Sequence, residues 1–453
     1  MMGRPSFDPT VTDAATVLPT FSRTDADGTE TAGSVVTWEQ MYRPTDPDGF
    51  GVVTVISLDL DANAQFTALG VAAEPGLVYS STEALYLTDT AFDLFGTERE
   101  TTDIYKFTYS GRGVVASATG SVPGRVLNQY SMSEHDGSLR VASTIGPRFG
   151  LFGPVAPSSN GVYVLQQDGS TLETVGRIDG LASGERLQAA RFVGDRGYVV
   201  TFEQVDPLFT LDLADPTNPR MVGELEVPGF STFVVPMDAN HLLTVGQFVP
   251  PPGDFGPWGV QVSIFDVTDF ANPQRTSNVI LGADAGAYSE ALFNPKAFTY
   301  FAERGLVALP ISIFEDSIFL GEEEAGFDMG MDGGMVVVNG SVEPTEPSAV
   351  DTVTVADVPQ VMDDESVPGE VVMPVTPILP GGFEGIVVLS ASPELGLSEI
   401  GRLSTRYPEA GVFYSNYARG VFIGDDVCAV TDRGVRRAPV ASVESVVGQL
   451  VFE

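Results

Sequence analysis

The sequence has few of the residues that nucleophilic or soft-metal chemistry requires. Among its 453 residues there is one cysteine, Cys428, and there are two histidines, His135 and His241. One cysteine excludes an internal disulfide and any zinc site built on paired cysteines. We interpret Cys428 as a buried, unreactive thiol in an apolar strand, and both histidines as solvent-facing turn residues.

Basic residues are also scarce. The 23 lysines and arginines face 61 aspartates and glutamates, which gives a formal net charge of −38 at pH 7, and only Lys106 and Lys296 are lysines. Such a surface repels phosphate groups, so the composition argues against a nucleic-acid partner. Two explanations of the acidity stay open: adaptation to a salty medium, in which counterions screen the self-repulsion, and calcium binding.

Long hydrophobic runs are missing as well. No stretch of about 18 or more apolar residues occurs, so we expect no transmembrane segment. Residues 1–9 lack the apolar core of a signal peptide, so the sequence as written shows no export signal.

What the sequence does contain is a repeated unit of short strands and tight turns. In the clearest pair of repeats, residues 211–219 and 265–273 match Asp for Asp and Asn-Pro for Asn-Pro. The strands between such turns are rich in β-branched residues and show no helical period, which predicts an all-β fold and a β-propeller. We count about six recognisable four-stranded blades, and the sequence leaves open whether the ring is incomplete at the N-terminus.

The repeated acidic and amide residues have a structural interpretation. Side-chain oxygens of Asp and Asn cap backbone N–H groups in turns, and proline fixes the backbone between adjacent strands. We therefore expect this capping role for Asp212, Asp215, Asn218, Asp266, Asp269 and Asn272.

Composition divides the chain into four parts. Residues 1–50 are predicted to be an irregular acidic segment, and residues 51–314 to form propeller blades. Residues 315–383 contain neither Lys nor Arg and are predicted to be a mobile, acidic, low-complexity insertion. The blade pattern then resumes, so residues 384–453 are predicted to form the final blade.

Several segments between about residues 104 and 310 carry a family likeness: residues 122–124, 127–132, 184–186, 191–196, 205–209 and 288–292. Together they resemble a family of secreted bacterial and archaeal proteins with a C-terminal β-propeller distantly related to WD40 repeats. The resemblance implies a propeller, export to the cell surface or beyond, and no assigned biochemical activity. Members of that family typically carry an export signal and further strands at the N-terminus. We therefore expect this chain to be truncated or to start late.

The densest polar positions in the family-like core are candidate ligand-binding residues. They are Arg186, Arg191, Asp195, Arg196, Tyr288 and Glu290. Two interpretations stay open for them: contact with a ligand, or buried arginine–carboxylate pairs between blades.

Carboxylates near Asp-Gly turns are candidate calcium ligands, because calcium prefers hard oxygen ligands on a tight loop. The candidates are Asp25, Asp27, Asp46, Asp48, Asp59 and Asp61. None of them completes a twelve-residue calcium loop with its terminal glutamate, and Asp-Gly is also common turn chemistry. We expect no other cofactor.

A repeat scaffold without a recognisable catalytic constellation predicts a non-enzymatic extracellular protein that presents a binding surface for a protein or a glycan. We expect a monomer. Two alternatives stay open. One is a secreted hydrolase or lyase that uses carboxylates, since two acids suffice for glycoside cleavage. The other is a fragment without independent function.

Overall fold

The computed structural model describes residues 18–24, 27–42, 51–59, 65–74, 76–91, 100–111, 113–150, 153–202, 206–250, 253–254, 256–314, 382–406 and 417–452. Within these ranges the chain forms β-strands and short 3₁₀ helices, and no α-helix occurs. Residues 315–381, which make up most of the expected insertion, lie outside them.

Most of the described strands belong to six antiparallel blades, numbered here along the chain. Blade 1 contains β6 (Val78–Ser80), β7 (Ala84–Ala91), β8 (Thr101–Ser110) and β9 (Gly113–Pro123). Blade 2 contains β10 (Arg125–Val126), β11 (Met132–His135), β12 (Ser138–Ile145), β15 (Ser159–Asp168) and β16 (Thr171–Leu181). Blade 3 contains β17 (Arg186–Val193), β18 (Arg196–Phe202), β19 (Asp206–Asp212) and β20 (Arg220–Val227).

The remaining blades follow the same plan. Blade 4 contains β21 (Phe230–Pro236), β22 (His241–Phe248), β23 (Gly259–Asp266) and β24 (Gln274–Leu281). Blade 5 contains β25 (Ala287–Tyr288), β26 (Thr299–Phe301), β27 (Leu306–Ile313), β28 (Phe383–Ser392) and β29 (Gly396–Ser404). Blade 6 contains β30 (Ala418–Ile423), β31 (Asp426–Thr431), β32 (Gly434–Pro439) and β33 (Gly448–Val451).

Smaller elements lie outside or between the blades. Two small sheets precede blade 1, formed by β1 (Thr20–Thr24) with β2 (Glu30–Ser34), and by β3 (Met41–Tyr42), β4 (Val53–Asp59) and β5 (Gln65–Val71). A hairpin of β13 (Arg148–Gly150) and β14 (Gly153–Ala156) interrupts blade 2. The 3₁₀ helices are η1 (Trp38–Gln40), η2 (Gln129–Ser131), η3 (Glu290–Leu292), η4 (Pro295–Ala297), η5 (Ala302–Arg304) and η8 (Val440–Ser442).

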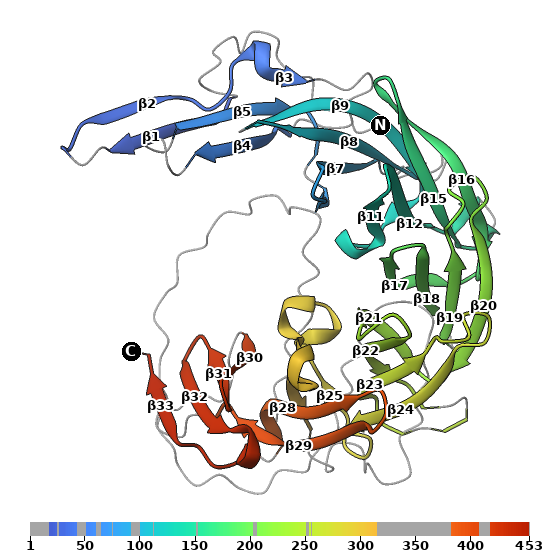
Figure 1. The fold of residues 1–453 in the computed structure, drawn as a ribbon, viewed down its shortest axis with the longest axis vertical. Helices are drawn as coiled ribbons and strands as arrows, with labels where there is room; N and C mark the ends of the chain where they lie inside the picture. Colours follow the sequence, from blue (N-terminus) through green and yellow to red (C-terminus); the bar gives the residue numbers. More distant parts are fainter. Residues whose placement is uncertain are drawn as a thin grey trace, which may run out of the picture.

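The blades follow one another around an arc, as Figure 1 shows. Strands β11, β17, β21 and β30 lie on the inner side of this arc, and β16, β20, β24 and β29 lie on the outer side. The arc is open between β33 and the β1–β2 hairpin (Figure 1). The short helix η2 stands on the inner side, next to β11.

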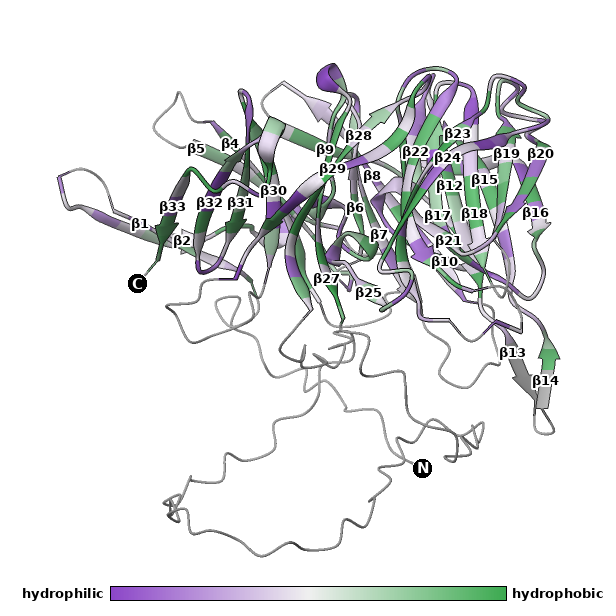
Figure 2. Ribbon diagram, turned by 90° about the horizontal axis from the view of Figure 1, so that it is seen from below, coloured by the Kyte–Doolittle hydropathy of each residue, from purple (hydrophilic) through white to green (hydrophobic). Residues whose placement is uncertain are grey.

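Each blade packs face to face with the next through an apolar layer. Between blades 2 and 3 this layer contains Val162 and Val199, and between blades 4 and 5 it contains Val262 and Leu309. Figure 2 shows apolar residues along strands such as β27 and β31, and polar residues in several connecting turns. The β-branched strand residues identified in the sequence therefore fill the spaces between sheets, as expected for strands whose two faces are both covered.

The outer turn of each following blade also packs against a small residue on the outermost strand of the blade before it. A Cβ atom added at Gly176 of β16 would lie 2.2 Å from the carbonyl oxygen of Pro216 in the β19–β20 turn. One added at Gly223 of β20 would lie 2.7 Å from the carbonyl oxygens of Phe270 and Ala271 in the β23–β24 turn. Only a residue without a side chain lets the two backbones approach so closely.

The other junctions repeat this arrangement. At the junction of blades 1 and 2, Gly120 of β9 lies against Leu172, and β9 and β16 form one parallel pair that joins the two blades into a nine-stranded sheet. At the junction of blades 4 and 5 the small residue is Ser277, whose Oγ accepts a hydrogen bond from the backbone N–H of Leu397 at 3.0 Å. At the last junction, a Cβ atom at Gly401 would lie 3.1 Å from Val443.

The Asp-rich turns have the capping role expected for them. Asp212 and Asp215 accept hydrogen bonds from the backbone N–H groups of Ala214 and Thr217, at 3.1 and 2.9 Å. Asp266 and Asp269 do the same in blade 4, at 2.8 and 3.2 Å. These bonds favour the ionised carboxylates, and the backbone N–H of Ala214, together with Arg220, lowers the pKa of Asp212 below its ordinary value. The capping prediction is therefore confirmed for these four aspartates.

The all-β fold and the count of about six blades are confirmed, but the expected boundaries differ from the structure. Residues 18–42 contain strands β1 to β3, where irregular chain was expected. The strands of residues 384–453 do not form one blade: β28 and β29 complete blade 5 by pairing with β27, and β30 to β33 form blade 6. The pairing of β27 with β28 joins segments about 70 residues apart, and a local repeat pattern carries no information on such a contact.

We predict that Gly176→Ala destabilises the protein by about 1–3 kcal/mol, the usual cost of overpacking, because the new methyl group would strike backbone atoms of the docked turn. The measurement is the urea midpoint of unfolding. Gly146→Ala is the matched control, since its Cβ would meet only the Glu100 carboxylate, at 3.5 Å. Equal midpoints for the two variants would contradict the docking role of Gly176.

A candidate ligand pocket between blades 1, 2 and 3

A pocket of about 440 Å³ lies where the inner elements of three blades meet. Strand β6 of blade 1, helix η2 and strand β11 of blade 2, and strand β17 of blade 3 form its walls. The lining residues are Val78, Tyr79, Ser80, Gln129, Tyr130, Met132, Ser133, Arg191 and Phe192. Its volume falls in the range of small-molecule sites, and it combines aromatic rings with a few polar groups, as such sites do.

Helix η2 fixes one wall of the pocket. Its N-cap residue, Asn128, accepts a hydrogen bond from the backbone N–H of Tyr130 through Oδ1, at 2.9 Å. This cap stabilises the single helical turn that carries Tyr130. The ring of Tyr130 packs edge-on against Phe233 of blade 4, with ring centroids 5.0 Å apart, so the wall is anchored on both sides.

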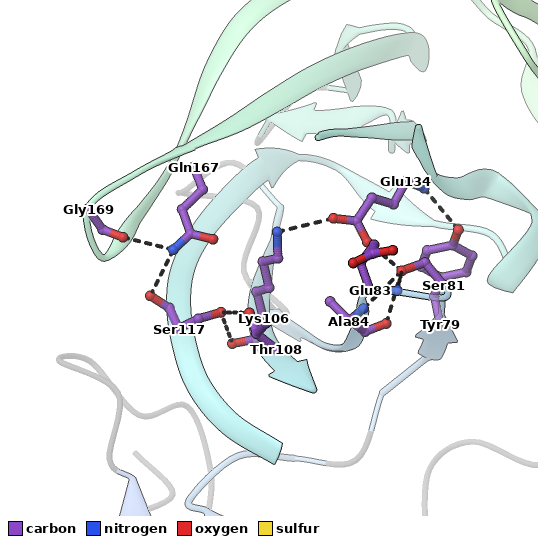
Figure 3. A network of polar contacts seen from close by, with 10 residues as sticks. All are labelled: Tyr79, Ser81, Glu83, Ala84, Lys106, Thr108, Ser117, Glu134, Gln167 and Gly169. Carbon is purple, nitrogen blue, oxygen red and sulfur yellow. Dashed lines mark hydrogen bonds and ion pairs between the residues drawn. The ribbon is translucent and has the colours of Figure 1, made fainter. Parts of the chain in front are cut away.

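A buried ion pair lies behind the pocket and joins blades 1 and 2 (Figure 3). Lys106 Nζ on β8 lies 3.1 Å from Glu134 Oε1 on β11, and the two side chains are only 12% and 6% exposed. Glu134 also accepts a hydrogen bond from Ser81 Oγ, and its backbone N–H donates to the Tyr79 hydroxyl at 2.9 Å. The ammonium group of Lys106 stands over the ring of Tyr86, 5.6 Å from its centroid.

These contacts keep Glu134 ionised. Burial alone would raise its pKa, but the hydrogen bonds from Ser81 and Lys106 and the charge of Lys106 outweigh burial and hold the pKa below its ordinary value of 4.5. Burial, together with the neighbouring carboxylate, raises the pKa of Tyr86 far above its ordinary value. The pair is therefore charged at neutral pH, and its two charges balance within the wall of the pocket.

Arg140 on β12 supports the pocket from a fully buried position, with 3% of its surface exposed. Its Nη2 donates to Ser133 Oγ at 2.8 Å, and its Nη1 donates to the carbonyl oxygen of Gly194. The guanidinium group lies over the Phe192 ring, 5.4 Å from the centroid. Burial lowers the pKa of Arg140, and the charges of Asp195 and other acidic groups only partly oppose this effect.

Among the described residues that line the pocket, Arg191 is the charged one. Its guanidinium group stands over the Tyr130 ring, 5.2 Å from the centroid. Its Nε is buried and has no hydrogen-bond partner, and within the described part of the chain no carboxylate or carbonyl oxygen pairs with its other nitrogens. Burial lowers its pKa, although an arginine stays protonated at neutral pH. A guanidinium in this state can donate hydrogen bonds to an acceptor group of a ligand.

Of the other candidate ligand-binding residues on blade 3, none lines this pocket. Arg186 is exposed at the start of β17, and Asp195 is exposed in the β17–β18 turn, 3.4 Å from His135. Arg196 donates to the carbonyl oxygen of Ala239 at 2.9 Å and stacks on Phe270 of blade 4. The structure therefore places Arg196 in a contact between blades.

Tyr288 and Glu290 line a second, smaller hollow of about 120 Å³ between blades 5 and 6. Glu290 forms a two-pronged ion pair with Arg419 on β30, at 2.6 and 2.8 Å. This pair joins blade 5 to blade 6, which is the structural alternative considered for these residues. Tyr288 is exposed and stacks on Phe293, with centroids 6.1 Å apart.

The candidate calcium ligands are only partly described. Asp25, Asp46, Asp48 and Asp61 lie outside the described residues, and Asp27 accepts a turn hydrogen bond from Thr29 at 2.9 Å. Within the described ranges, no group of three or more His, Cys, Asp or Glu side chains, Asp59 included, is arranged to hold a metal ion. Calcium binding stays a prediction.

The remaining reactive residue types have ordinary surroundings. Cys428 is buried, as predicted, and burial raises the pKa of its thiol, which disfavours the reactive thiolate. His241 follows a turn, but its Nδ1 lies 2.9 Å from Asp238 and its side chain is only 22% exposed, which is more buried than expected.

Sequence reasoning missed most of this pocket. Of the polar residues that line it, only Arg191 was a candidate, whereas Tyr79 and Ser133 were not, and neither were Lys106 and Glu134 behind it. One signal was available: Lys106 is one of two lysines in a chain that otherwise uses arginine. Lysine is the more compact and strongly hydrated cation, so its retention at one strand position indicates a specific partner.

We predict that Lys106→Met destabilises the protein by about 3–5 kcal/mol, because it leaves the Glu134 carboxylate buried without a cation. The double variant Lys106→Met with Glu134→Gln is expected to recover most of this loss, since Gln is neutral and still accepts the bond from Ser81. Urea unfolding free energies test both. A double variant no more stable than the single one would contradict the account.

The lowered pKa of Glu134 predicts a pH dependence. Its ionised form stabilises the fold fully above the ordinary value of 4.5, and this stabilisation is lost as pH falls through the lower pKa of the folded state. The stability difference between the wild type and Glu134→Gln should therefore shrink below pH 4.5. Unfolding free energies of both proteins between pH 7 and pH 3 check this, and a difference that grows in acid would refute it.

The sequence is similar to two archaeal proteins. It is 39% identical over 213 residues to an uncharacterized protein of Archaeoglobus fulgidus, an alignment that covers 47% of this chain and 30% of that protein. It is 40% identical over 158 residues to an uncharacterized protein of Methanocaldococcus jannaschii, covering 35% and 23% of the two chains. The matched segments thus span less than a third of each of these relatives.

No helix within the described ranges has the length and apolar character needed to cross a membrane. The Beta propeller domain family matches residues 7–443, which include blades 1 to 5, strands β30 to β32 of blade 6 and the pocket. The chain therefore belongs to the β-propeller domain family.

Proposed function

We propose that the protein is a non-enzymatic binding scaffold that acts outside the cell, as a monomer, and that its ligand is a protein or a glycan. The observation that supports this most directly is the pocket between blades 1, 2 and 3, whose lining contains an arginine with no hydrogen-bond or ion-pair partner among the described residues. Ligand sites are commonly concave and mostly pre-formed, with binding residues positioned by a rigid scaffold. The extracellular location rests on the family resemblance of the sequence.

The chemistry of the pocket favours binding over carboxylate catalysis. Glu134, the carboxylate behind the pocket, accepts bonds from Lys106 and Ser81, and its pKa is lowered. A general acid needs the opposite, a raised pKa and a free path to the substrate. The polar groups that do reach the pocket, such as Arg191 and Ser133, are suited to hold a ligand in place.

The test is a screen of the full chain against immobilised glycans and peptides, followed by a variant that fills the pocket. Val78 lines the pocket and is 52% exposed, so Val78→Trp should be tolerated and should block entry. We expect it to weaken binding of any specific ligand at least about tenfold, equal to about 1.4 kcal/mol.

Val155→Trp is the matched control, because Val155 is exposed on β14 and does not line the pocket. Binding that survives Val78→Trp unchanged would move the binding site elsewhere. If no immobilised glycan and no immobilised peptide binds specifically, the proposed function is wrong.

A further inference from the structure

Arg191 differs from the described arginines that pair with carboxylates. Several arginines pair directly with carboxylates, for example Arg220 with Asp212 at 2.6 Å and Arg402 with Glu399 at 2.6 Å. Arg191 is partly buried and has only an aromatic ring as a partner. A buried guanidinium is costly without acceptors, so the lack of an acidic partner for Arg191 among the described residues favours a ligand group there.

The hydroxyl groups beside Arg191 are oriented by the protein. Ser133 Oγ accepts a hydrogen bond from Arg140, and the Tyr79 hydroxyl accepts one from the backbone N–H of Glu134. Each hydroxyl has one proton, which these bonds leave free to be donated. Both residues line the pocket together with Arg191, whose guanidinium has donors and no acceptor. The pocket therefore presents hydrogen-bond donors to its occupant.

Hydrogen-bond donors of this kind favour an anion, and the positive charge in the pocket limits how much negative charge that anion can carry. Arg191 contributes one unit of charge to the lining, while Lys106 is already neutralised by Glu134. The fork of a guanidinium matches the two oxygens of a carboxylate. A carboxylate carries one negative charge, whereas a phosphate monoester carries up to two, so a carboxylate balances Arg191 without excess.

The net charge of −38 does not prevent an anion from entering. At physiological ionic strength the screening length is about 8 Å, so distant surface carboxylates contribute little at the pocket. What matters is the local set of groups, and within the described lining the charged residue is Arg191.

The rest of the lining favours a sugar over a peptide. Five of the nine lining residues are Tyr, Ser or Gln, whose hydroxyl and amide groups can bond to the hydroxyl groups of a saccharide. The pocket offers aromatic rings at Tyr79, Tyr130 and Phe192, which suit the apolar faces of a sugar ring.

We propose that the pocket binds an acidic saccharide and that Arg191 anchors the carboxylate of its sugar residue, with Ser133 and Tyr79 as additional donors. This inference rests on the proposed function, since it names the ligand class of the same pocket. It concerns binding alone, and no bond of the saccharide is broken.

The experiment measures affinities of the folded full chain by calorimetry. The probes are trigalacturonic acid, a guluronate trisaccharide, a hyaluronan tetrasaccharide and sialyllactose, each compared with its neutral methyl ester. We expect at least one acid to bind, with its ester at least about tenfold weaker, since a hydrogen bond to a charged group is worth a factor of about 10 to 100.

Substitutions then assign the anchor. Arg191→Met should weaken the acid by about 10- to 100-fold and leave the ester unchanged. Arg191→Lys keeps the positive charge and loses the forked geometry, so its affinity for the acid should lie between those of the wild type and Arg191→Met. Arg186→Met is the matched control, because Arg186 lies on the same strand and outside the pocket, and it should bind like the wild type. Urea midpoints establish that each variant is folded.

Several outcomes would overturn the inference. They are no binding of any acid, equal binding of acid and ester, or an Arg191→Met variant with wild-type affinity. Tighter binding of a tripeptide with a free C-terminal carboxylate than of every saccharide would assign the anchor to a peptide and refute the sugar. If a neutral ligand from the glycan panel binds and is blocked by Val78→Trp, the proposed function stands and this inference fails.

Discussion

The outer turn of each blade from 2 to 6 docks onto a small residue of the preceding blade, and this contact determines how closely neighbouring blades approach. At Gly176 and Gly223 the turn backbone lies where a side chain would otherwise be. At Ser277 the same position adds a hydrogen bond to the turn. This close approach sets the spacing between sheets at their outer edges, and the apolar layers between blades fill the space that results. The arc of blades in Figure 1 is the sum of these junctions.

The pocket is a consequence of that spacing, because no single blade contains it. Tyr79 comes from blade 1, Ser133 from blade 2 and Arg191 from blade 3. Behind them, the backbone N–H of Glu134, whose side chain pairs with Lys106, donates a hydrogen bond to the Tyr79 hydroxyl, and Arg140 donates one to the Ser133 hydroxyl. Both hydroxyl oxygens therefore already accept a hydrogen bond. These interior contacts leave the two hydroxyl groups as hydrogen-bond donors toward the pocket. A site positioned this way by neighbouring blades needs no mobile loop to be complete.

Much of the fold could be predicted from the sequence, because blades 3 and 4 are each contiguous and their turns have Asp, Asp, Asn and Pro at matching positions. Blade 5 could not be predicted, since β27 and β28 are far apart in the chain and pair only in the folded structure. The same reason explains why most of the pocket could not be predicted. Arg191 stands in a conspicuously polar segment, but Ser81 and Glu134 are 53 positions apart, and Glu290 and Arg419 are 129 positions apart. Contacts across blades leave no periodic signal in the sequence.

A crystal structure of the chain with a bound acidic trisaccharide would show whether Arg191 holds the sugar. We expect the sugar carboxylate to lie about 2.7–2.9 Å from two nitrogens of Arg191, with the Ser133 and Tyr79 hydroxyl groups within hydrogen-bond distance of the same ligand. A saccharide bound with its carboxylate in solvent, or bound away from blades 1, 2 and 3, would contradict it.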